Sequence, residues 1–172
     1  MATIFCSTKL STLLGLPKKS NQLITAAVDP HSWNVLLFYL NKRKCLLFMH
    51  KQTLYSFLAL DIVKKDLADF PKFFRQHFTD QLLADQMINE RAKVMLEKDY
   101  GSIILKPTDN DKKVIGSMND CIFRVRYYDS RDDEDGRSKS ATYIAHQFNK
   151  TPMGAIDYAH PVEKMKEFLH KI

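Results

Sequence analysis

The sequence feature that most constrains the fold is a pair of apolar runs separated by a short polar break. Residues 33 to 40 and 44 to 49 are apolar and rich in strand-forming types, and Asn41, Lys42 and Arg43 stand between them. Two such runs joined by so few polar residues are typical of a β-hairpin. We therefore expect an antiparallel pair of strands with a basic tip.

Strand and helix signals then divide the chain into two parts. Leu67, Phe70, Phe74, Phe78 and Leu82 recur every three or four residues, which is the spacing of one helical face. This pattern predicts a helix that starts near Asp69 with Pro71 in its first turn. Further strands are expected at 3–6, 23–28, 53–60 (whose spacing also fits a helical turn) and 102–105, and further helices at 7–15, 85–98, 112–128, 140–148 and from Pro161 onward.

Because the strands cluster early and the helices late, the sequence favours an α+β fold. We expect a small antiparallel sheet from the N-terminal half, packed against about five helices. The 172 residues, 45% of them apolar, are enough for one domain spanning 1–172. Residues 129–139, DSRDDEDGRSK, contain no apolar side chain, so we expect an exposed polar loop there.

Composition and motifs exclude several classes of protein. Neither a signal-peptide core nor an apolar stretch of membrane-spanning length is visible, and the three cysteines are widely spaced, so we expect a soluble cytoplasmic protein that makes no contact with a membrane. Glycine-rich phosphate loops, nucleophile elbows and HExxH are absent, and the six histidines lack metal-ligand spacing. We therefore expect neither a cofactor nor a metal.

The charge of the chain is unevenly distributed along the sequence. Residues 1–60 carry seven Lys or Arg and a single acid, so this third accounts for the whole net charge of +6. A concentration of positive charge attracts polyanionic partners. Lys42, Arg43 and Lys44, with Trp33 nearby for stacking, could bind nucleic acid or a protein partner. The alternative is that these cations are solvated loop residues.

The predicted helix over 112–128 carries a second polar group. Ser117, Asp120 and Arg124 fall three and four residues apart, so they are neighbours on successive turns. Asp120 could act as a base or hold a cation while Arg124 binds an anion. The alternative is an intrahelical ladder of hydrogen bonds and ion pairs. Gly116, unfavourable inside a helix, indicates that another group approaches closely there.

Several short motifs resemble those of a known family. Trp33-Asn34, RKCLLF at 43–48, GSMND at 116–120 and NKTPM at 149–153, followed by Tyr158 and Pro161, resemble an uncharacterised bacterial domain family that is catalogued only as a domain of unknown function. The resemblance implies one complete domain and a bacterial source. It also gives weight to Arg43, Lys44, Asn119 and Asp120, which lie inside the motifs, whereas His50 stands where the family is expected to have Asn.

Three hypotheses about function follow from these residues. The first is a non-enzymatic binding module for nucleic acid or a protein partner, with the basic N-terminal third as its surface. The second is a phosphate- or phosphodiester-processing enzyme, with Asp120 and Asn119 as catalytic candidates close to Arg43 and Lys44. The third is a structural or interaction protein in which Asp120 bonds Arg43 or a loop amide. The sequence does not indicate an oligomeric state.

Overall fold

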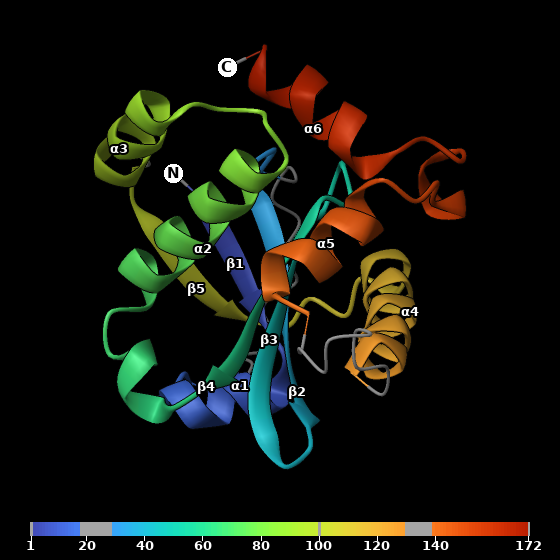
Figure 1. Ribbon diagram of the computed structural model, residues 1–172. Coiled ribbons are helices and arrows are strands. Elements are labelled where there is room, and N and C mark those ends of the chain that lie inside the picture. The colour runs from blue at the N-terminus through green and yellow to red at the C-terminus, as the bar shows by residue number, and fades with distance from the viewer. Residues whose placement is uncertain (1, 18–28, 100, 130–138, 172) are drawn as a thin grey trace.

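The computed structural model describes residues 2–17, 29–99, 101–129 and 139–171 (Figure 1). The strands are β1 (Ala2–Cys6), β2 (Ser32–Leu40), β3 (Arg43–His50), β4 (Ser56–Ile62) and β5 (Ile103–Pro107). The helices are α1 (Thr8–Leu14), α2 (Phe70–Ala84), α3 (Glu90–Asp99), α4 (Lys112–Asp129), α5 (Ala141–Asn149) and α6 (Pro161–Leu169), with 3₁₀ turns η1 (Lys64–Leu67) and η2 (Gly154–Ile156). The expected strand at 23–28 and nearly all of the expected loop at 129–139 lie outside the described residues.

The α+β class is confirmed, but the sheet is mixed rather than antiparallel. Its order is β4-β3-β2-β1-β5. The segment β2-β3-β4 is antiparallel, whereas β1 runs parallel to both β2 and β5. The helix α1 stands between β1 and β2, and a helical connection allows the next strand to run parallel. β5 comes from the second half of the chain and adds an edge strand, where Pro107 is tolerated.

The hairpin predicted from the sequence is confirmed, and its turn is tighter than expected. Leu40 lies opposite Arg43, so only Asn41 and Lys42 form the turn. Both have positive φ angles, 48° and 65°, which is the backbone of a type I′ turn. Arg43 is therefore the first residue of β3 and not part of the loop.

Alternation along the strands creates two apolar cores, one on each face of the sheet. In β3, Leu46 and Phe48 face one core, and Cys45, Leu47 and Met49 face the other. The first core lies under α1, α2 and α6, and the second lies under α4 and α5 (Figure 1). None of the helices in the described ranges is long and apolar enough to cross a membrane.

The prediction of a helix over 85–98 is wrong about where the helix starts. Asp85 ends α2, and Gln86 takes a left-handed conformation with φ 56°, so residues 85–89 form a turn. The helix α3 begins only after Asn89, whose Oδ1 accepts from the N–H of Ala92 at 2.9 Å. Val94 and Met95 of α3 are 62% and 63% exposed because α3 lies at the periphery of the first core.

Candidate binding site

Two of the motifs found in the sequence meet at one surface pocket. The pocket has a volume of about 270 Å³ and lies between α4 and the segment that follows α5. Its described lining consists of Ser117, Asp120, Cys121, Arg124, Pro152, Met153, Gly154 and Ala155. Residues of GSMND and of NKTPM, about 30 positions apart in the chain, thus share one site.

The amphipathic character of α4 sets the orientation of its half of the pocket. The helix is capped by Asp111, whose Oδ1 accepts from the N–H of Val114 at 3.2 Å. Its buried face consists of Val114, Met118, Cys121, Ile122 and Val125. This face packs on the second core, so the polar stripe at 117, 120 and 124 is left beside the pocket.

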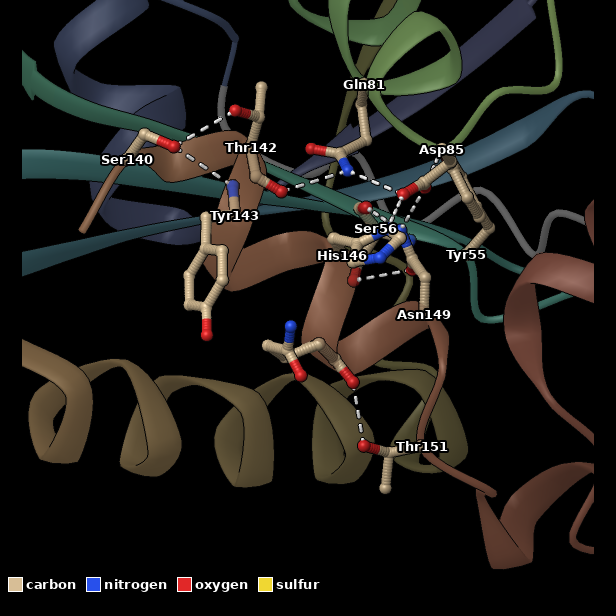
Figure 2. A network of polar contacts seen from close by, with 11 residues as sticks. Tyr55, Ser56, Gln81, Asp85, Ser140, Thr142, Tyr143, His146, Asn149 and Thr151 are labelled. Atoms are coloured by element: carbon tan, nitrogen blue, oxygen red, sulfur yellow. Dashed lines mark hydrogen bonds and ion pairs between the residues drawn. The ribbon is translucent and has the colours of Figure 1, made fainter.

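The other half of the pocket is held in place by Asn149, the first residue of NKTPM. Asn149 is fully buried at the end of α5 and pairs with the backbone of Ser56 in the edge strand β4 (Figure 2). Its Oδ1 accepts from the Ser56 N–H at 2.9 Å, and its Nδ2 donates to the Ser56 carbonyl at 2.9 Å. The amide therefore satisfies a backbone pair that a further strand would otherwise satisfy.

The segment after Asn149 forms a small closed loop. Thr151 donates through Oγ1 to the Gln147 carbonyl at 2.8 Å, and Met153 and Ala159 form a β-bridge. Asp157 and Tyr158 have positive φ angles of 55° and 60°, which bring the Tyr158 ring over the loop. A Cβ on Gly154 would lie 3.7 Å from that ring, and Tyr158 is 77% exposed. An exposed aromatic ring therefore lies beside Gly154, which is one of the residues that line the pocket.

The ladder expected along α4 does not form. Ser117 donates through Oγ to the carbonyl of Lys113 at 3.0 Å instead of bonding Asp120. Within the described ranges, the side chains of Asp120 and Arg124 form neither a hydrogen bond nor an ion pair, although both residues line the pocket. A carboxylate and a guanidinium are therefore available to a ligand from the same wall.

Cys121 contributes packing to the pocket and no reactivity. Its side chain is buried, and burial raises the pKa of its thiol to about 12. The thiol is protonated at neutral pH, whereas nucleophilic attack and metal binding require the thiolate. In the part of the chain that the structure describes, no three His, Cys, Asp or Glu side chains are grouped so that they could hold a metal ion.

The basic residues of the hairpin lie apart from this pocket. Arg43 forms an ion pair with Asp61 of β4 at 2.9 Å, with both side chains about half exposed. Asp61 reaches Arg43 from a β-bulge, where its φ is 56°. The expected bond between Asp120 and Arg43 is therefore not formed, and the described lining of the pocket does not include Arg43. Lys42 is exposed and Lys44 is half-buried.

Trp33 and Asn119 also lie outside the pocket lining. Trp33 is 1% exposed, and its indole contacts the rings of Phe57, Phe74 and Phe78 in the first core. A buried indole cannot stack on a nucleotide, so the basic hairpin is left without the aromatic partner expected from the sequence. Asn119 is exposed on α4.

Sequence reasoning missed a buried polar network next to Asn149. The carboxylate of Asp85, which is fully buried, accepts from four side chains (Figure 2). These are Tyr55 at 2.6 Å, Asn149 at 3.1 Å, Gln81 at 3.3 Å, and Nδ1 of His146 in a short contact. The donors come from the residue that precedes β4, from α2 and from α5, so no local pattern in the sequence indicates the cluster. Only the NKTPM motif pointed to any member.

The network works as a joint between α2, α5 and β4. The charge of the buried Asp85 carboxylate is compensated by the four donors around it. The side chain of His146, at the edge of the cluster, is 26% exposed. Burial, together with the charge and hydrogen bond of Asp85, raises the pKa of Tyr55 well above its usual value. Tyr55 therefore stays protonated and remains a donor. The joint fixes α5, from which the pocket loop begins.

The fold and the pocket define a small α+β protein with one site assembled from two separate motifs. The family model described as "Domain of unknown function (DUF6933)" matches residues 3–164. The chain therefore belongs to this family. No curated protein matches the sequence.

Proposed function

We propose that the protein is a non-catalytic binding module that recognises a peptide segment of a protein partner in the pocket between α4 and residues 152–155. The observation that carries the proposal is the pair of opposite charges on one wall. Asp120 and Arg124 both line the pocket, and in the described part of the chain neither is engaged by another side chain. A site that offers one negative and one positive side chain suits a ligand that itself carries a positive and a negative group, and a peptide is such a ligand.

The remaining lining supports the same class of ligand. Arg124 can bind a carboxylate through two parallel N–H donors, and Asp120 can accept from an amide or a cationic side chain. Pro152, Met153 and Ala155 offer apolar surface, and methionine adapts to different side chains. The volume of about 270 Å³ is just below the range of about 300–1,000 Å³ typical of drug-sized ligands, so one or two side chains fit.

The two other functions suggested by the sequence have less support. A nucleic-acid surface on the hairpin would rely on Arg43, which Asp61 already pairs, and on Trp33, which is buried. A phosphate-processing reaction would need a cation close to Asp120, and the described lining supplies only Arg124. The buried Cys121 thiol supplies no nucleophile.

The proposal can be tested with a phage-displayed library of random heptapeptides. Immobilised protein should enrich a consensus that contains a charged residue next to an apolar one. Arg124→Gln should lower the affinity for the synthetic consensus peptide, measured by calorimetry, about 10- to 100-fold. The reason is that a hydrogen bond between charged groups contributes about 1.5–3 kcal/mol. Asp120→Asn should lower the affinity for this peptide as well.

Arg126→Gln is the matched control, because Arg126 is exposed on the same helix and is not part of the described lining. The affinity of this variant should equal that of the unmodified protein. The proposal would fail if no peptide were enriched, or if Arg124→Gln and Arg126→Gln bound the consensus peptide equally well.

A further inference from the structure

A second surface, distant in sequence from the pocket, lies along the exposed side of α2. Two adjoining depressions there share Lys72 and Gln76. The first, with a volume of about 420 Å³, opens between α2 and α3 and is lined by Lys72, Arg75, Gln76 and Lys93. The second, of about 440 Å³, extends toward the end of β4 and includes His77 and Leu60 in its lining.

The first depression is cationic. Three of its four described lining residues are Lys or Arg, and none is acidic. Lys93 pairs with Asp80 at 2.6 Å, whereas Lys72 and Arg75 have no carboxylate partner in the described ranges. Lys72 and Arg75 are three residues apart on α2, so they lie on the same side of the helix. A phosphate group between them would be bound by both.

The second depression is mixed in character. The imidazole of His77 lies against the Phe73 ring, with centroids 4.2 Å apart, and its Nδ1 donates to the Phe73 carbonyl at 2.9 Å. The ring is therefore held in one orientation. Asp66 and Asp69 also line this depression, and each accepts one backbone N–H. A flat ring beside hydrogen-bond acceptors suits a nucleobase, which stacks on aromatic side chains and carries N–H donors.

We propose that this α2 groove binds single-stranded nucleic acid, with a phosphate in the first depression and a base in the second. Lys72, shared by both depressions, would lie beside the junction of the two groups. A single strand is favoured over a duplex because a paired and stacked base cannot enter the second depression. Among the described residues, none lines both the groove and the α4 pocket, so this inference is independent of the proposed peptide recognition.

The experiment is fluorescence anisotropy with a labelled 12-nucleotide single-stranded RNA in 20 and 200 mM KCl. One phosphate neutralised between Lys72 and Arg75 predicts a slope of about −0.7 for log affinity against log salt, and hence about fivefold weaker binding at the higher salt. Lys72→Gln combined with Arg75→Gln should lower the affinity at least tenfold at 20 mM and remove most of its dependence on salt. His77→Ala should weaken binding about fivefold or more.

Controls separate this site from general charge attraction. Lys112→Gln with Lys113→Gln removes two exposed cations elsewhere, on α4, and should leave the affinity and the slope nearly unchanged. A duplex of the same sequence should bind more weakly, and inorganic polyphosphate of equal charge should compete poorly. The proposal is overturned if RNA does not bind at 20 mM KCl, or if the two double variants lose affinity equally. It is also overturned if the duplex or polyphosphate binds as well as the single strand.

Discussion

His50 is the buried side chain whose protonation couples most directly to folding. Its Nε2 donates to the Pro30 carbonyl at 2.8 Å, its Nδ1 accepts from Thr53 Oγ1 at 3.0 Å, and its ring contacts Trp33. Both ring nitrogens are thus satisfied in the neutral form. Burial lowers the pKa of His50 from 6.5 to about 4. The unfolded chain therefore takes up a proton at a higher pH than the folded one.

This difference predicts a loss of stability on mild acidification. As the pH falls from 6.5 toward 4, the unfolded state is favoured by up to about 3 kcal/mol, since one pKa unit corresponds to about 1.4 kcal/mol. Urea unfolding between pH 7 and 4.5 measures this slope. His50→Asn, which places an uncharged amide there, should show a flatter dependence over the same window. Equal slopes for the two proteins would contradict the assignment to His50.

Tyr55 tests the buried network around Asp85. Tyr55→Phe removes a 2.6 Å hydrogen bond to the carboxylate while keeping the ring. The free energy of unfolding should fall by about 1.5–3 kcal/mol, because the acceptor is charged and buried. Tyr143→Phe is the control, since Tyr143 is 45% exposed and should change stability by less than about 0.5 kcal/mol. Equal effects in urea unfolding would show that the network contributes little.

At the scale of elements, Asn149 connects α5 to the edge of the sheet. Asn149→Ala would leave the Ser56 N–H and carbonyl without partners in a buried position. We expect a loss of about 2–4 kcal/mol in the free energy of unfolding. Hydrogen exchange of the Ser56 amide should accelerate more than that of Leu47 in β3, whose backbone lies within the sheet. If both amides respond equally, Asn149 stabilises the whole fold and has no special role at the edge.

Most elements could be predicted from local patterns, because their signals lie within a few residues. The polar break at Asn41 and Lys42 predicted the hairpin, and Asp69 with Pro71 predicted the start of α2. The start of α3 could not be predicted in this way. Asp85 ends α2 within a network that includes Tyr55, just before β4, and Asn149 in α5, both far away in sequence.

The candidate site was predictable only in part for the same reason. Helical spacing placed Ser117, Asp120 and Arg124 on one side of α4, and the structure places all three in one pocket. The opposite wall comes from residues 152–155, and no spacing within the chain indicates that the two segments meet. The ion pair between Arg43 and Asp61 could not be predicted from the sequence either, because a bulge in β4 brings Asp61 to Arg43.

For the whole molecule, charge along the sequence and charge in space differ. The excess of bases lies in residues 1–60, but Arg43 is paired with Asp61, and the partly buried Lys51 is paired with Asp109 and Asp111. Lys72 and Arg75 on α2, from a segment that is nearly neutral, line a depression and have no carboxylate partner in the described ranges. Folding thus separates a cationic groove on α2 from a pocket of mixed charge on α4.

The most direct test of the account is a residue-resolved NMR titration with the heptapeptide that the library enriches most. Peptide recognition at the α4 pocket predicts that the largest amide shifts fall on Ser117, Cys121, Arg124, Met153 and Gly154, and that Arg124→Gln raises the peptide concentration needed for them about 10- to 100-fold. Shifts centred on the hairpin or on α2, or shifts that saturate at the same peptide concentration in Arg124→Gln as in the unmodified protein, would contradict the central claim.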